Sequence, residues 1–261
     1  MKCGARVAHV ARLAPATIAR RLASISKAHQ AAGLENSPAS TRHFVVSEVL
    51  KGARRTLGVA QKCKDPLLLN DICRLLAACP QNLLGLRDRA LILVGFAGAF
   101  RRSELCAMAV SDLCFSDSGL VITVPRSKAD QERAGEKVAI VFGEHKDTCP
   151  IKALRKWLKT AKVKDGAVFR GVDRHGNVAS TGLHRDSIAE ILKTAATGAG
   201  INATNIAGHS VRAGMATQAA LNGSSERAIA RTTRHRSRRV LRRYIRPGEM
   251  FRENASASLG L

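Results

Sequence analysis

The chain has 261 residues and a mass of 27.9 kDa, enough for one large domain or two small ones, and its hydrophobic fraction of 45% is that of an ordinary globular protein. Forty-three Lys and Arg against twenty Asp and Glu give a formal net charge of +23, which favours a polyanion as the partner over a merely basic surface. No run approaches the ~18 apolar residues of a membrane span and no signal peptide is evident, so we expect a cytoplasmic protein.

The seven cysteines are odd in number, scattered, and form no C-x-x-C pair. This pattern favours reduced, packing cysteines over disulfides or structural zinc. His145 and Cys149 lie four apart and could share a helix face, but two ligands of unlike type are a weak metal signal. We therefore expect neither a metal nor another cofactor.

The first sixty residues predict two helices and a linker. Residues 15–32 place apolar side chains on one face of a helix that begins with Pro15 and is closed by Gly33. A second amphipathic helix is expected over residues 40–57. Gly, polar residues and a Pro interrupt the pattern over residues 58–68. We expect a domain boundary near residues 62–65, which separates a helical domain over 1–62 from a larger domain over 66–261.

The larger domain is predicted to be mainly α with a small antiparallel β-sheet. Helices are expected over 68–79 and 85–100, the second of them apolar over most of its surface and therefore buried. The β-branched runs at 120–125 and 137–143 indicate two strands joined by a hairpin loop. Helical patterns then resume at 149–161, 183–200, 210–222, 224–233 and 237–245.

Four separated stretches carry groups that phosphate chemistry would use. In chain order these candidates are Arg101 with Glu104, Lys128, His209 with Arg212, and His235 with Tyr244, the only tyrosine of the chain. Taken singly, each has an ordinary structural reading, such as a helix cap, a solvated lysine or an aromatic core anchor. Their joint spacing favours one shared site, with Arg212 three residues after His209 and Tyr244 nine residues after His235.

On these residues the sequence resembles the tyrosine recombinases, the phage-integrase family with its Cre-like and Xer-like members, from about residue 14 to the C-terminus. In the stretch FRRSEL, Arg101 resembles the family's first arginine and Glu104 its supporting carboxylate, and in SKADQ, Lys128 resembles the hairpin lysine. In GHSVRAG, His209 and Arg212 resemble the His-x-x-Arg box. In RHRSRRVLRRYIRP, His235 resembles the His/Trp position and Tyr244 the nucleophile. The resemblance implies a short all-α core-binding domain, apparently shortened, followed by a tyrosine-recombinase catalytic domain.

The implied function is site-specific DNA recombination or integration through a covalent 3′-phosphotyrosine at Tyr244. Arg101 and Arg212 suit the phosphate oxygens because a guanidinium stays charged and directs two donors toward two oxygens. The resemblance gives Lys128 the role of general acid. It makes His209 the general base and a phosphate donor, and His235 a donor to a non-bridging oxygen. Arginines flanking Tyr244 would bind DNA and favour the phenolate.

The partners that the resemblance implies are double-stranded DNA with a specific recombination site and, on that DNA, three further copies of the chain in a homotetramer. The location would be the cytoplasm, with the nucleoid. One departure from the family is Arg234, where relatives often have Gly before the histidine. Two alternatives remain open: a catalytically silent or regulatory DNA-binding relative, and a type IB topoisomerase-like strand relaxer.

Overall fold

The computed structural model describes residues 13–34, 41, 43–59, 64–124, 135–235, 237–249, 256 and 259, without the side chains of 246–249. The chain divides into two compact units, residues 1–63 and 64–261. The assignment of the first unit to DNA binding stays a prediction. None of the helices in these described parts is long and apolar enough to cross a lipid bilayer.

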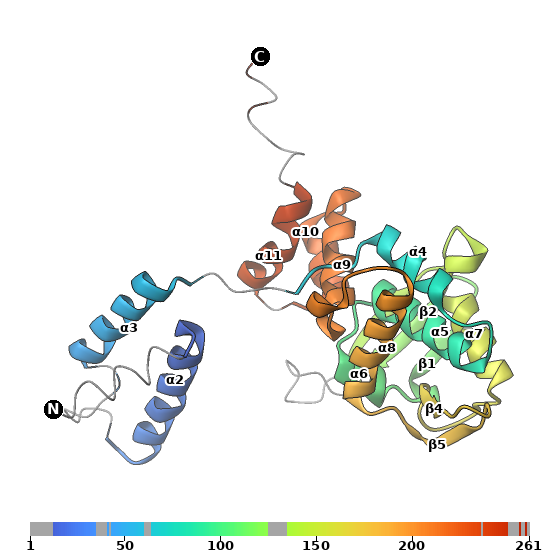
Figure 1. Cartoon of the computed structure of the whole chain (residues 1–261), viewed down its shortest axis with the longest axis horizontal. Helices are drawn as coiled ribbons and strands as arrows, with labels where there is room; N and C mark the ends of the chain where they lie inside the picture. Colours follow the sequence, from blue (N-terminus) through green and yellow to red (C-terminus); the bar gives the residue numbers. More distant parts are fainter. Residues whose placement is uncertain are drawn as a thin grey trace. The chain divides into compact units, whose positions relative to one another are not determined.

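The first unit contains α2 (Pro15–Ala31) and α3 (Phe44–Leu57), which pack against each other (Figure 1). Pro15 begins α2, where its missing N–H leaves no backbone bond unmade. The His43 ring accepts a hydrogen bond from the Val45 amide at 3.3 Å and so caps α3. The second predicted helix therefore begins at Phe44, later than expected.

The helices of the second unit are α4 (Leu69–Ala78), α5 (Leu83–Ala97), α6 (Arg102–Ala107), α7 (Pro150–Thr160), α8 (Arg185–Gly198), α9 (Gly208–Leu221), α10 (Glu226–Thr233) and α11 (Arg238–Glu249). Helix α5 is buried over most of its length and packs against both α7 and α9 (Figure 1). Helix α8 packs against α4 and α6, and α9 in turn carries α10 and α11. Helix α9 thus connects the main core, through Val211, with a smaller apolar cluster that it forms with α10 and α11.

The described strands form two small antiparallel sheets. Strands β1 (Leu113–Phe115), β2 (Leu120–Val124) and β3 (Glu136–Ile140) pair in that order, with Leu120 opposite Ile140. Side chains of β2 alternate between buried and half-buried, so one face of the sheet covers the core. Strands β4 (Arg170–Val172) and β5 (Val178–Gly182) pair separately. The predicted fold class, mainly helical with a small antiparallel sheet, is confirmed.

The turn between α5 and α6 differs from the prediction. The expected helix over 85–100 ends at Ala97, and Ala99 takes a left-handed conformation with φ of 47°. Arg101 consequently lies at the N-terminal cap of α6, and not at the end of a buried helix as expected. This short turn brings the Gly98 and Ala99 carbonyls to the site described next.

Candidate active site

Arg101 is fixed by the carboxylate three residues after it. The Arg101 amide donates to Glu104 Oε2 at 2.8 Å, and a terminal guanidinium nitrogen donates to Glu104 Oε1 at 2.5 Å. The Glu104 side chain is 2% exposed and that of Arg101 is 19% exposed. Glu104 therefore holds both the backbone and the side chain of Arg101, while part of the guanidinium faces the surface.

Glu104 also pairs with a second arginine. A terminal nitrogen of Arg234 lies 2.6 Å from Glu104 Oε2. Burial would raise the pKa of the Glu104 carboxyl, but the guanidinium groups of Arg234 and Arg101 outweigh that effect and hold this pKa below its usual value. The carboxylate is thus ionised and bridges two cations.

Arg212 reaches the same place from α9. One terminal nitrogen donates to the Ala99 carbonyl at 2.6 Å and the other to the Thr233 carbonyl. Burial and the nearby Arg101 and Arg234 lower the pKa of Arg212 to about 10, so the group stays charged at neutral pH. Each terminal nitrogen carries two hydrogens, which leaves donors beyond these two bonds.

His235 follows the end of α10 and lies beside the nucleophile candidate. Its Nδ1 is 2.7 Å from the Thr233 hydroxyl oxygen, and its ring centroid is 5.7 Å from that of Tyr244. Burial, followed by the positive charges of Arg212 and Arg101, lowers the pKa of His235 to about 4. The imidazole is consequently neutral at pH 7.

Tyr244 is positioned by α11. Leu241 and Ile245, on the same side of this helix, are buried in a small apolar cluster with α9 and α10, and the Tyr244 side chain packs against that cluster while remaining half-buried. The Thr217 hydroxyl of α9 donates to the Tyr244 carbonyl at 2.8 Å. The ring is therefore anchored without being sealed in the interior.

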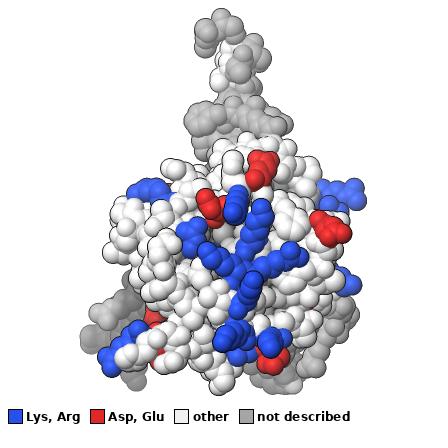
Figure 2. All heavy atoms as spheres, turned by 90° about the vertical axis from the view of Figure 1, so that its right-hand side faces the viewer, with Lys and Arg blue, Asp and Glu red and all other residues white. Residues whose placement is uncertain are grey.

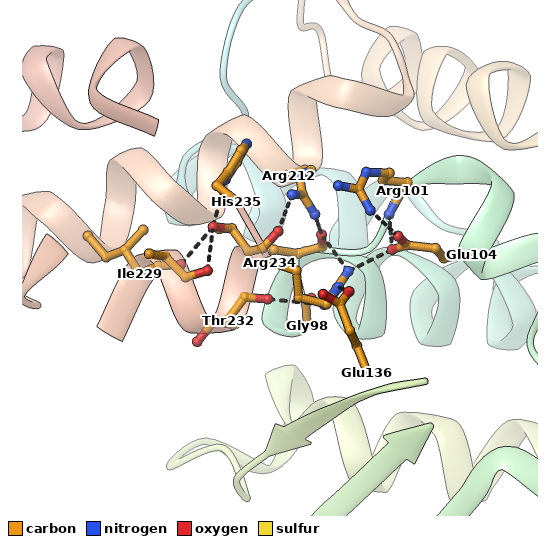
Figure 3. Close-up of polar contacts among 12 residues, drawn as sticks. Gly98, Arg101, Glu104, Glu136, Arg212, Ile229, Thr232, Arg234 and His235 are labelled. Atoms are coloured by element: carbon orange, nitrogen blue, oxygen red, sulfur yellow. Dashed lines mark hydrogen bonds and ion pairs between the residues drawn. The ribbon is translucent and has the colours of Figure 1, made fainter. Parts of the chain in front are cut away.

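The remaining candidates differ in how far the structure describes them. His209 lies in the first turn of α9, and its side chain is exposed. It is among the groups that lower the pKa of His235, after burial and the arginines. Lys128 lies outside the described residues. In Figure 3 the side chains of His235, Arg212 and Arg101 follow one another along one side of the Arg234–Glu104 pair.

Arg234 is the residue of this site whose inward position sequence reasoning missed. It ends α10 with φ of 55° and ψ of 43°, and its side chain is 3% exposed. From sequence it was a side chain at a turn where relatives often have Gly, and one of the arginines around Tyr244 that were expected mostly to contact DNA phosphates or the neighbouring surface. The available signal was an arginine at a predicted helix end, which does not reveal that the side chain turns inward.

One face of the protein carries a group of basic side chains (Figure 2). On the face shown in Figure 2, Lys and Arg side chains gather in the middle, with a few Asp and Glu side chains around them. A cationic surface of this kind attracts polyanions and raises their rate of association.

The chain is similar in sequence to known proteins. Residues 67–249 match the sequence profile of the Phage integrase family. The chain is 39% identical over 240 residues to an integrase/recombinase XerD homologue of Selenomonas ruminantium, a match that covers 92% of this chain and 70% of that protein. It is 29% identical over 180 residues to the tyrosine recombinase XerD of Listeria innocua, covering 67% of this chain but 56% of that one.

Two solved structures share the fold. The crystal structure of XerA recombinase superposes with a TM-score of 0.56 at 19% identity, covering 93% of this chain and 84% of that one. The Tn1549 transposon integrase in complex with transposon right-end DNA gives a TM-score of 0.62 at 17% identity, covering 93% and 80%. At these identities the likeness concerns the fold.

Proposed function

The chain belongs to the phage integrase family of tyrosine recombinases, and from that premise we propose that its own residues cut and rejoin DNA at a specific site through a 3′-phosphotyrosine at Tyr244. The observation that carries the proposal is the convergence of Arg101, Arg212, His235 and Tyr244 from α6, α9, the α10–α11 turn and α11. Arg101 and Tyr244, which are 143 positions apart in the sequence, thus contribute to the same site.

Arg101 and Arg212 would bind the non-bridging oxygens of the scissile phosphate. A phosphodiester resists nucleophiles because of its negative charge, which grows in the transition state, so fixed cationic donors lower the barrier. Arg212 is held by two backbone carbonyls and Arg101 by Glu104. Neither guanidinium has to reorganise when the phosphate arrives, which is the condition under which such donors are most effective.

In the proposed reaction the Tyr244 oxygen attacks phosphorus while the bond from phosphorus to the 5′ oxygen breaks. The phenol proton passes to His209 as general base, and Lys128 protonates the leaving 5′ oxygen. His235 contacts a non-bridging oxygen. The tyrosyl ester keeps the energy of the broken bond, so the 5′ hydroxyl of a second strand can attack it and release Tyr244 in the reverse step.

Trapping of the covalent adduct tests this proposal. A pool of nicked duplexes with randomised sequence should yield a protein–DNA adduct, because the short fragment that carries the released 5′ hydroxyl diffuses away after cleavage, and sequencing the trapped DNA reports the site. Tyr244→Phe should abolish the adduct. Arg212→Lys should slow its formation by about 10²–10³, the scale of a lost oxyanion donor. An adduct of normal yield with Tyr244→Phe would refute the assignment.

The same preparation separates the alternatives. A silent DNA-binding relative would bind the duplexes without forming an adduct. A strand relaxer would remove supercoils from plasmids lacking the recovered site, whereas a site-specific recombinase requires that site.

We further propose that four copies assemble on paired DNA sites and that the enzyme acts in the cytoplasm, with the nucleoid. The basis is the family membership, because joining strands in a new pairing needs two duplexes cut in one assembly. Light scattering of the protein with the recovered duplex should give the mass of four chains and two duplexes.

A further inference from the structure

Arg234 occupies a backbone conformation that disfavours it. Its φ of 55° and ψ of 43° lie in the left-handed region, where a Cβ is crowded and Gly is the usual residue. Arg234 is one of three non-glycine residues with positive φ in the described parts of the chain, and Ala99 of the facing turn is another. A side chain kept at such a position needs contacts that hold it there.

The Arg234 side chain makes those contacts inside the protein. One terminal nitrogen donates to the Gly98 carbonyl at 3.1 Å and to the Thr232 carbonyl at 3.0 Å. The other donates to Glu104 Oε2 at 2.6 Å and lies 3.4 Å from the Ala99 carbonyl, and the guanidinium lies 5.0 Å from the centre of the Phe100 ring. At 3% exposure the group is not available to bind DNA.

These contacts join the turn that leads to His235 with the turn that leads to Arg101 (Figure 3). Glu104 has two oxygens: Oε2 accepts from Arg234, and Oε1 thereby faces Arg101. The Ala99 carbonyl, which accepts from Arg212 at 2.6 Å, is also next to Arg234. One buried side chain thus supports the partners of both phosphate-binding arginines.

We propose that Arg234 is a positioning residue for the cleavage reaction: by holding Glu104 and the 98–99 turn, it orients the Arg101 and Arg212 guanidiniums toward the scissile phosphate. The inference rests on the proposed function of the site. It predicts that loss of Arg234 impairs the chemical step, whereas DNA binding, which depends on exposed cations, is retained.

Arg234→Gly is the first variant to test, because Gly relieves the left-handed backbone while it removes the whole side chain with its guanidinium. The single-turnover cleavage rate on the nicked duplex recovered with the wild-type protein, measured at saturating protein, should fall about ten- to hundredfold, the range for losing a buried charge-assisted contact. The Kd for the same duplex should change less than about twofold. Arg227→Ala, which removes an exposed arginine of α10, is the matched control and should leave the cleavage rate at saturating protein unchanged, even where it weakens the Kd.

Arg234→Gln covers the case in which the Gly variant does not fold, as judged by circular dichroism, because it keeps the three side-chain carbons and a polar end group without the charge. A merely structural role is distinguished by combining it with Glu104→Gln. If Arg234 acts through Glu104, the double variant should be no more than about threefold slower than Glu104→Gln alone, because residues of one network are not additive.

Cleavage by Arg234→Gly or Arg234→Gln at the wild-type rate would overturn the inference, and so would losses that simply multiply in the double variant. Absence of any adduct with the wild-type protein would instead refute the proposed function, so the two failures are distinguishable.

Discussion

Glu104 places one negative charge among three guanidinium groups, so replacing this single residue should have a large effect on the stability of the fold. Glu104→Gln removes the closer carboxylate partner of the buried Arg234, at 2.6 Å, and leaves only Glu136, whose Oε2 lies 3.7 Å from Arg234 Nε. Breaking a buried ion pair by removing one partner costs about 3–5 kcal/mol, so the free energy of unfolding in urea should fall by an amount of this order. Its control is Glu226→Gln, which breaks a pair with Arg242 that is 56% exposed and should change stability by about 0–1 kcal/mol. Equal losses in the two variants would contradict the bridging role of Glu104.

The titration of His235 gives a second prediction at this scale. Its pKa is lowered from 6.5 to about 4 in the folded chain, so between these pH values the unfolded chain binds more protons. Above about pH 6.5 the ring is neutral in both states, and the stability that depends on it is fully present. As the pH falls toward 4 the unfolded chain takes up the proton first, and this stability is lost. Urea unfolding of the wild type and of His235→Gln should show a steeper acid decline in the wild type. Parallel curves would show that His235 is not buried in a cationic pocket.

Sequence predicted the chemistry of single residues better than their contacts. Arg101, Arg212, His235 and Tyr244 could be selected because their residue types and spacing suit phosphate chemistry, and the structure brings them together. The inward course of Arg234 could not be selected. It depends on a left-handed backbone and on the carboxylate of a residue 130 positions away, which no local pattern encodes.

At the scale of elements, α11 holds the tyrosine through its buried side. Leu241 is 0% exposed in the cluster between α11, α9 and α10. Leu241→Ala should lower the free energy of unfolding by about 2–5 kcal/mol and reduce adduct formation, because the helix that carries Tyr244 loses a fully buried apolar contact. The adjacent Val240 is 39% exposed, and Val240→Ala should change stability by no more than about 0.5 kcal/mol. The idea fails if the two variants unfold alike.

Helices were predicted more reliably than strands, for physical reasons. The amphipathic segments α7 and α8 show the helical period in their sequence, and α5 is recognised by the length of its apolar run. Strands β1 and β4 have three residues each, too few to show alternation, and β5 is mostly exposed Ala, Ser, Thr and Gly. The end of α5 was placed too late because the apolar run continues to Phe100, although Ala99 breaks the helix with positive φ.

At the scale of the whole molecule, the net charge of +23 should make DNA affinity strongly dependent on salt. A protein that makes six to ten phosphate contacts loses about 10³–10⁵ in affinity between 50 and 200 mM salt. Fluorescence anisotropy with a duplex lacking the recovered site should show a linear fall of log affinity with log salt. Arg239→Gln, which removes an exposed arginine of α11, should make the slope shallower by about one if that residue contacts a phosphate. A flat salt dependence would exclude a polyelectrolyte mode of binding.

The hydrogen bond between Thr233 and His235 bears on the tautomer of the imidazole. When the Thr233 hydroxyl donates to the Ile229 carbonyl, which lies at 2.7 Å, its oxygen accepts from His235 Nδ1. A neutral ring in this tautomer carries its lone pair on Nε2 and can donate to a phosphate from there only after protonation. If His235 makes that contact, calorimetry in buffers of different ionisation enthalpy should detect proton uptake on binding, and none with His235→Gln. A threonine that never touches the substrate would thus decide which atom of the imidazole is free to react.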